Sequence, residues 1–440
     1  MVELAAPGSV ATVSISRVNV GILGGGNVGG ALVELIERDR AEIAKRTGIE
    51  LVVTAVAVRS LSKQRPFEID AALLTTAAAQ IVEDPEVDLV VEVLGGIEPA
   101  RSLISSALRH GKAVVTANKE LLANVGHELF AISDETERDL LFEAAVAGGI
   151  PIIRPLRESL VGERISTVMG IVNGTTNYIL TQMTDHSVSY RDALSQAQDL
   201  GFAERDPTAD VEGYDAGAKA AIMASIAFGS KVVAGDVFHE GISNITLADI
   251  EYAAHMGYRI KLLAICERFD DDSVAVRVHP TMVPVAHPLA SVAGSYNAVF
   301  IEGDAVGQLM FYGRGAGGYP TASAVLGDVI DAASNLGKGA HGSIGTFAPC
   351  RIRTIDEMQS AFYVNLVVSD EPGVLGSVAQ IFGENAVSIR SMEQDPVDGG
   401  ARLVFITHAA SESSLRKTLK TLGALDTVAS INSVLRVIES

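Results

Sequence analysis

Short apolar runs alternate with helix-like stretches in the N-terminal part of the chain. An apolar run at 18–23 (VNVGIL) ends in three glycines, and a stretch with helically spaced apolar residues follows at once. Further apolar runs lie at 51–58, 88–93 and 113–117. Strands that alternate with helices assemble as parallel βαβ units. We therefore predict an α/β domain with a parallel sheet.

The pattern changes after Pro151 to mixed strands and helices with polar loops, which indicates an α+β domain. A glycine-rich turn at 313–328 opens another helical pattern, which we expect to return to the first domain. The final segment, 362–437, reads as strand, helix, strand, strand, helix and strand. This βαββαβ order predicts a separate, ferredoxin-like C-terminal domain.

A length of 440 residues fits two or three domains. The expected division is a disordered tail at 1–16, a nucleotide-binding domain at 17–150 with about 319–345, a substrate-binding and dimerisation domain at 151–318, a linker at 346–358 and a regulatory domain at 359–440.

Composition narrows the functional class. The chain is 48% hydrophobic and carries a formal net charge of −20, so we expect a folded, acidic protein that binds neither nucleic acid nor a membrane surface. Cys266 and Cys350 are too few for a disulfide framework and favour a reducing compartment. The N-terminus lacks a secretory pattern, and the apolar stretch at 220–229 is too short to span a bilayer. We expect a cytoplasmic protein.

The glycines after the first strand fit the spacing GxGxxG. Gly24 would allow the tight turn, Gly26 the approach of a pyrophosphate, and Gly29 the packing of helix on strand. Asn27 and Val28 would then present the helix N-terminus to the phosphates. A plain connecting turn is the alternative, but the strand before and the helix after favour a Rossmann-type dinucleotide site.

The end of the second strand bears on cofactor choice. An NAD site would place an acidic residue there, whereas this chain has Arg59, Ser60 and Lys63. Cations suit a 2′-phosphate, so NADPH is the preferred cofactor, with NADH still possible. The alternative is that Arg59 and Lys63 are solvated loop charges.

Two lysines are candidates for catalysis. Lys119 follows an apolar strand directly, where ligands of parallel sheets gather, although it could also be an exposed lysine at a helix start. Asp215 and Lys219 lie four residues apart, hence on one helical face, before a stretch that is apolar around most of its circumference. A surface ion pair is the simpler alternative, but a buried helix would place the Lys219 amine where its pKa can move.

The motifs GFAERDPTADVEGYDAGAK, GIVNGTTNYI, TANKE and GRGAGGYPTASAVLGD together resemble the homoserine dehydrogenases, from about Val18 to Gly342. The resemblance implies reversible reduction of L-aspartate 4-semialdehyde to L-homoserine, in threonine, methionine and isoleucine biosynthesis. It makes Lys219 the proton donor and places Lys119 at the reacting centre and beside the cofactor. Glu204, Asp210 and Asp215 would bind the substrate or orient the lysines. It also implies substrate contacts for Gly174 and Thr176, and a cofactor contact for Gly317.

The same resemblance implies a monovalent cation site in the segment EAAVAGGIPII. Oxygens of Glu143, Val146, Gly148 and Ile150 would hold a sodium ion there, although the segment alone is a glycine-rich turn. Phe202 departs from the family pattern, because some relatives carry Tyr at this place and a hydroxyl contact would be lost.

The C-terminal segment resembles an ACT domain, most specifically in DEPGVLGSVAQIFGENAVSI. Pro372-Gly373 would open a helix whose amides can receive an amino-acid carboxylate. The resemblance implies effector contacts by Asp370, Gly373, Leu375 and Asn385 across a dimer interface, with threonine as the effector. A module that only dimerises is equally compatible. We expect a homodimer or homotetramer.

Two rival functions remain. Another NADPH-dependent dehydrogenase of a small amino-acid-like substrate is one, although a phosphorylating semialdehyde dehydrogenase would need a nucleophilic cysteine with a His partner. An amino-acid-binding regulator with a silent nucleotide fold is the other. The presence of both lysines and all three carboxylates argues against it.

Overall fold

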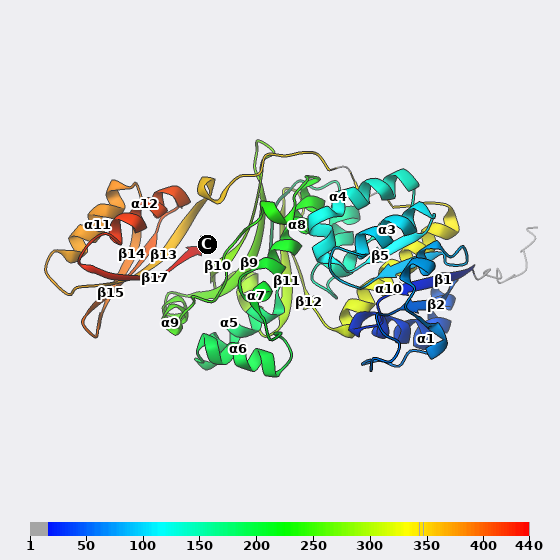
Figure 1. Cartoon of the computed structure of the whole chain (residues 1–440). Helices are drawn as coiled ribbons and strands as arrows, with labels where there is room; N and C mark the ends of the chain where they lie inside the picture. Colours follow the sequence, from blue (N-terminus) through cyan, green and yellow to red (C-terminus); the bar gives the residue numbers. More distant parts are fainter. Residues whose placement is uncertain (1–15, 343, 346, 440) are drawn as a thin grey trace, which may run out of the picture. The chain divides into compact units, whose positions relative to one another are not determined.

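The computed structural model describes residues 16–342, 344–345 and 347–439, and Figure 1 shows the order of their elements. Contacts divide the chain into two compact units. The first contains Met1–Asn118, Glu128–Phe142 and Gly317–Ser343; the second contains Lys119–His127, Glu143–Ala316 and Ile344–Ser440. Residues 1–15 of the predicted tail lie outside the described residues. Ser16, the last residue assigned to that tail, already belongs to the first strand.

The first unit contains a six-stranded, wholly parallel sheet in the order β3-β2-β1-β4-β5-β6. Its strands are β1 (Ser16–Leu23), β2 (Ile49–Ala57), β3 (Leu74–Thr75), β4 (Leu89–Glu92), β5 (Ala113–Thr116) and β6 (Leu140–Leu141). This is the order of a dinucleotide-binding Rossmann sheet, in which the crevice lies at the carboxyl ends of β1 and β4. The predicted parallel α/β fold is confirmed.

Helices accompany this sheet as the alternating pattern predicts. They are α1 (Asn27–Thr47), α2 (Ala78–Glu83), α3 (Ala100–Arg109) and α10 (Gly318–Lys338), while α4 (Lys119–Thr136) contributes residues to both units. The central strands β4 and β5 are buried at every position, which explains their continuous apolar runs. Helix α10 packs on α1, so the chain returns to the first unit after residue 316, as expected.

The second unit begins with a mixed α+β part. Its strands are β7 (Ile165–Ile171), β8 (Phe238–His239), β9 (Tyr258–Arg268), β10 (Val274–Pro284), β11 (Tyr296–Gly303) and β12 (Gly307–Arg314). Its helices are α5 (Gly174–His186), α6 (Tyr190–Asp199), α7 (Thr208–Val211), α8 (Tyr214–Phe228) and α9 (Leu247–His255). Helix α8 is the predicted apolar helix, and it packs on β9 and β10.

The C-terminal part of this unit has the predicted βαββαβ order, with one additional two-residue strand, β16, before the second helix. It consists of β13 (Gln359–Val368), α11 (Val374–Glu384), β14 (Ile389–Val397), β15 (Gly400–Thr407), β16 (Ala410–Ser411), α12 (Glu412–Leu422) and β17 (Val428–Val437). Strand β17 pairs with β13 and, in parallel over two residue pairs, with β10. One sheet, ordered β12-β11-β7-β9-β10-β17-β13-β15-β14, therefore runs through both parts.

The two faces of β13 pack on different partners. Phe362, Val364 and Leu366 belong to the apolar core formed with α11 and α12. The alternate residues Tyr363 and Asn365 are also buried, and both donate hydrogen bonds to Asp249 of α9. The C-terminal sheet is thus covered on its second face by a helix of the preceding part. No helix among the described residues is long and apolar enough to cross a membrane.

Candidate active site

A single carboxylate joins the two predicted lysines. Helix α8 begins after Gly213, whose φ of 84° is the left-handed conformation that glycine adopts freely. Asp215, in the first turn, lies 2.6 Å from the Lys219 Nζ through Oδ2 and 2.6 Å from the Lys119 Nζ through Oδ1. Both lysines and the carboxylate belong to the second unit. The structure therefore brings together Lys119, Asp215 and Lys219, as predicted.

The two amines have different surroundings. The Lys219 amine is buried and also donates to the Val172 carbonyl oxygen at 2.7 Å. Burial lowers the pKa of Lys219, and the Asp215 carboxylate opposes this only in part. The Lys119 side chain is 44% exposed. Burial also disfavours its charge, but Asp215 outweighs this and raises the pKa of Lys119. Lys219 is thus the amine that gives up a proton more readily.

Asp215 itself stays ionised. Burial works to raise its pKa, but the charges of Lys219 and Lys119 outweigh burial and hold the pKa far below the usual range. A carboxylate that accepts hydrogen bonds from two ammonium groups is fixed in position as well as in charge. It can hold both amines at one place while leaving Lys219 the more acidic.

Asn173 is a member of this site that the sequence analysis did not single out. It caps α5, accepting from the Thr176 amide at 2.9 Å, and its Nδ2 donates to Asp210 at 2.7 Å and to Asp215 at 2.9 Å. The sequence did contain an indication, because Asn directly before a helix is a typical N-cap residue. Burial raises the pKa of Asp210, and the Asn173 hydrogen bond opposes this.

Of the other predicted substrate residues, Asp210 lies at the cluster and Glu204 does not. Glu204 is exposed, and in the contacts of the described residues its carboxylate reaches neither lysine. Thr176 is buried and donates to the Asn173 carbonyl, so it supports Asn173. Gly174 allows a close approach, since a Cβ there would lie 2.7 Å from the Ser295 carbonyl oxygen. The Phe202 ring lies beside that of Tyr178.

The glycine turn of the first unit has the form that a dinucleotide needs. Gly24 has a φ of 118°, and a Cβ on Gly29 would lie 1.8 Å from the Gly24 carbonyl oxygen. A Cβ on Gly26 would meet nothing within 4 Å, so this position is open to a ligand. No side chain caps α1, which leaves its N-terminal turn at Asn27 and Val28 available to an anion. These residues fit a bound pyrophosphate.

A pocket of about 370 Å³ adjoins this turn. Its lining includes the predicted residues Arg59 and Lys63, and also Arg65, which the sequence analysis missed. Arg65 donates to the carbonyl oxygens of Ser60, Leu61 and Lys63, so it holds the loop that carries the other two cations. No Asp or Glu is among the residues that line this pocket. The pocket therefore suits a ligand that carries extra negative charge.

Gly317 lies at the start of α10, where its φ of 120° favours glycine. The next residue, Gly318, packs closely on α1, since a Cβ there would lie 3.1 Å from the Asn27 carbonyl oxygen. The structure thus places the predicted cofactor residue Gly317 beside the N-terminal turn of α1. The close approach of Gly318 explains why two consecutive glycines stand at this point.

The predicted cation loop is a compact turn. The Glu143 carboxylate accepts hydrogen bonds from the amides of Ile152, Ile153 and Arg154. Gly148 has a φ of 53°, and a Cβ there would lie 2.3 Å from the Gly315 carbonyl oxygen. Because these amides engage both carboxylate oxygens, a cation here would depend on backbone carbonyls, which are ligands that sodium accepts. Among the described residues, no cluster of His, Cys, Asp and Glu could hold a metal.

The predicted effector residues lie at opposite ends of α11. Gly373, with a φ of 94°, precedes the helix beside Asp370 and Leu375, whereas Asn385 follows it and donates to the Ile381 carbonyl. Eleven helical residues span about 16 Å. One chain therefore cannot bring Asp370 and Asn385 to the same small amino acid. A shared site would need two chains, as the prediction states.

Family models match three segments of the chain. Residues 24–143 match the NAD-binding domain of homoserine dehydrogenase, residues 151–330 match homoserine dehydrogenase, and residues 362–427 match the ACT domain. The first segment contains the glycine turn and Lys119, the second contains Asp215 and Lys219, and the third contains most of the C-terminal βαββαβ part.

Homoserine dehydrogenases of other organisms match most of the chain. The homoserine dehydrogenase of Corynebacterium glutamicum is 49% identical over 427 residues, covering 96% of each chain. The crystal structure of a homoserine dehydrogenase from Thiobacillus denitrificans has a TM-score of 0.90 at 40% identity, covering 96% of this chain and 99% of that one. A hyperthermophilic archaeal homoserine dehydrogenase in complex with NADPH has a TM-score of 0.61 at 30% identity, covering 72% of this chain and 98% of that one.

Proposed function

The chain belongs to the homoserine dehydrogenase family, and we propose that it reduces L-aspartate 4-semialdehyde to L-homoserine, reversibly, with NADPH as preferred cofactor. The observation that carries this proposal is the Asp215 carboxylate held between the amines of Lys119 and Lys219. A small carbonyl substrate needs a proton at its oxygen when it is reduced, and a buried, acidified lysine supplies one.

Lys219 is the proton donor in this proposal. A nicotinamide cofactor would supply the hydride when bound, whereas this chain supplies position, charge and the proton. Lys219 donates its proton to the former carbonyl oxygen in the reduction and accepts it back in the oxidation of homoserine. Burial lowers the pKa of Lys219, which favours release of its proton to the substrate oxygen. Asp215 keeps the amine in place throughout.

Lys119 and the remaining carboxylates serve the substrate. The partly exposed, charged Lys119 adds positive potential beside the reacting oxygen, where negative charge develops. Asp210, held by Asn173, binds the substrate ammonium or hydroxyl. Glu204 is also proposed as a substrate ligand, but it is exposed and would have to turn toward the substrate on binding.

The preference for NADPH follows from the pocket beside the glycine turn. Arg59, Lys63 and Arg65 line it together, and its lining contains no carboxylate to receive a ribose 2′-hydroxyl. Cations at this place favour a 2′-phosphate. The relative in complex with NADPH is consistent with this choice.

The C-terminal ACT domain is proposed to bind threonine between two chains, with Asp370 and Asn385 on opposite sides of the ligand. Helix α11 has no side-chain cap, so its first amides suit a carboxylate. A sodium ion held by backbone carbonyls of the loop at 143–150 is also part of the proposal. The assembly is a homodimer or homotetramer.

One assay tests the activity directly. Purified protein should oxidise NADPH when aspartate semialdehyde is added, and a regulator with a silent nucleotide fold should not. Lys219→Met keeps the length of the buried side chain and should reduce turnover by about 10²- to 10⁴-fold.

The matched control is Lys261→Met. Lys261 is also a buried lysine that donates to a backbone carbonyl, that of Val292 at 2.6 Å, but it is outside the cluster. This variant should lose stability and keep its turnover per folded molecule. Equal turnover in wild type and Lys219→Met would refute the proposed donor.

A further inference from the structure

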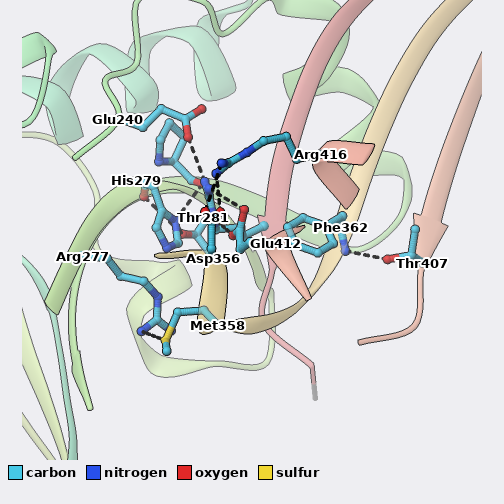
Figure 2. Close-up of polar contacts among 12 residues, drawn as sticks. Glu240, Arg277, His279, Thr281, Asp356, Met358, Phe362, Thr407, Glu412 and Arg416 are labelled. Carbon is cyan, nitrogen blue, oxygen red and sulfur yellow. Dashed lines mark hydrogen bonds and ion pairs between the residues drawn. The ribbon is translucent and has the colours of Figure 1, made fainter. Parts of the chain in front are cut away.

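The last strand of the chain carries a buried cation that joins the C-terminal domain to the catalytic part. Arg436 of β17 pairs in the sheet with Thr281 of β10. Its guanidinium is held from two sides, by Glu412 of α12 and by Glu240, which lies 2.8 Å away. In Figure 2 the side chains of Glu240 and Glu412 lie near His279 and Thr281. Glu412 belongs to the C-terminal domain, and Glu240 does not.

Glu240 opens a short segment that contacts α7. Its amide donates to the Val278 carbonyl of β10 at 2.8 Å. Two residues later the Ile242 amide donates to the Val211 carbonyl at 2.8 Å, and Ser243 donates to the Glu212 carboxylate. Gly241 lies so close that a Cβ there would be 2.3 Å from the Val211 carbonyl oxygen. Any shift of this segment therefore acts on the end of α7.

Helix α7 carries Asp210, and it has little stability of its own. It has four residues, follows Pro207 without a side-chain cap, and is too short to be stable without its neighbours. Asp210 directly precedes Val211, and it reaches the lysine cluster through Asn173. The path from Arg436 to Asp210 thus consists of one ion pair, three residues of chain and one backbone hydrogen bond.

We infer that Glu240 is a positioning residue for substrate binding, through which Arg436 of the C-terminal domain fixes the place of Asp210. The inference rests on the proposed function, in which Asp210 binds the substrate. It requires that Glu240 act on substrate affinity and leave the proton transfer at Lys219 alone. Through these contacts the C-terminal domain can affect the position of a residue in the substrate site.

Glu240→Gln and Glu412→Gln form a matched pair for the test. Each removes one carboxylate partner of the same guanidinium, but only Glu240 belongs to the segment that contacts α7. Full-length enzyme with each substitution is assayed for kcat and KM toward homoserine and toward NADP⁺, and for thermal midpoint. Arg436→Lys provides a second variant of the same contact. It keeps the positive charge but loses the planar guanidinium that interacts with Glu240 and Glu412 together.

Glu240→Gln and Arg436→Lys should raise KM for homoserine by about 2- to 5-fold, the size expected for a partly exposed ion pair. The kcat and the KM for NADP⁺ should not change, and Glu412→Gln should lower the thermal midpoint with a wild-type KM. A wild-type KM in Glu240→Gln, or an equal rise in Glu412→Gln, would overturn the inference while the proposed function stands. A wild type without dehydrogenase activity would overturn both, because Asp210 would then have no such substrate to position.

Discussion

Lys219 is subject to two opposing charges, and their effects can be separated. Asp215 raises the pKa of Lys219, whereas the nearby Lys119 lowers it. In homoserine oxidation Lys219 must be neutral to accept a proton, so activity rises as pH passes through its pKa. Lys119→Met removes a positive charge, and the rising limb of kcat/KM should therefore move to higher pH.

Asp215→Asn should produce the opposite shift. Loss of the carboxylate lowers the pKa of Lys219 further, so the rising limb should move to lower pH. The measurement is kcat/KM for homoserine over a wide pH range in the wild type and the two variants. Both variants will have reduced rates, but only the position of the limb matters here. Shifts in one common direction would contradict the assignment of Lys219 as the titrating group.

Cofactor choice is also a property of single residues. Arg59→Asp places a carboxylate in the pocket where a ribose 2′-hydroxyl would lie, and it repels a 2′-phosphate. The ratio of kcat/KM for NADPH to that for NADH should fall by about tenfold or more, as expected for loss of a charge-assisted contact. Lys45→Asp makes the same charge change in the last turn of α1 and should leave the ratio unchanged. A constant ratio in both variants would point to Lys63 or Arg65 instead.

At the level of elements, two glycines in the turn between β1 and α1 have different roles, one in folding and the other in cofactor binding. A Cβ on Gly29 would collide with the Gly24 carbonyl, whereas one on Gly26 would enter open space. Gly29→Ala should therefore lower the thermal midpoint of the protein, because the helix can no longer approach the strand. Gly26→Ala should keep the wild-type midpoint and raise KM for NADPH. Equal midpoints in the two variants would show that the turn adapts.

The sequence predicted the parallel sheet well because its central strands β4 and β5 are buried on both faces. Val90 and Val114 lie in strands that are buried at every position, which favours apolar residues at successive positions and gives continuous apolar runs. The cluster of Asp215 with Lys219 was predictable because helical spacing fixes which residues meet. Asn173 could be predicted as an N-cap, but its hydrogen bonds to Asp210 and Asp215 join distant segments and follow no periodicity. The role of Arg65 depends on a loop, where no periodicity applies. Glu204 and Asp210 belong to one motif, and only three-dimensional structure separates the exposed carboxylate from the one at the cluster.

For the whole molecule, the order of domains could be predicted from the sequence but their connection could not. The parallel pairing of β17 with β10 involves two residue pairs and leaves no pattern in the chain. The same is true of Asp249, which is wholly buried and accepts hydrogen bonds from Tyr363, Asn365 and Ser433 of the C-terminal sheet. Such contacts join segments far apart in sequence. They make the ACT domain an integral part of the catalytic unit.

Feedback by threonine, if the ACT domain binds it between two chains, can be tested by complementation. Asp370 and Asn385 lie at opposite ends of α11, so a complete site takes Asp370 from one chain and Asn385 from another. Asp370→Ala and Asn385→Ala should each abolish inhibition by threonine while leaving uninhibited turnover unchanged. In a mixed dimer of the two variants, one site of the symmetric pair has both natural residues and the other has neither. Co-expressed and separately tagged chains, purified as the mixed species, should therefore regain inhibition at a threonine concentration near that of wild type. Full inhibition in either single variant, or no recovery of inhibition in the mixed dimer, would place the effector elsewhere.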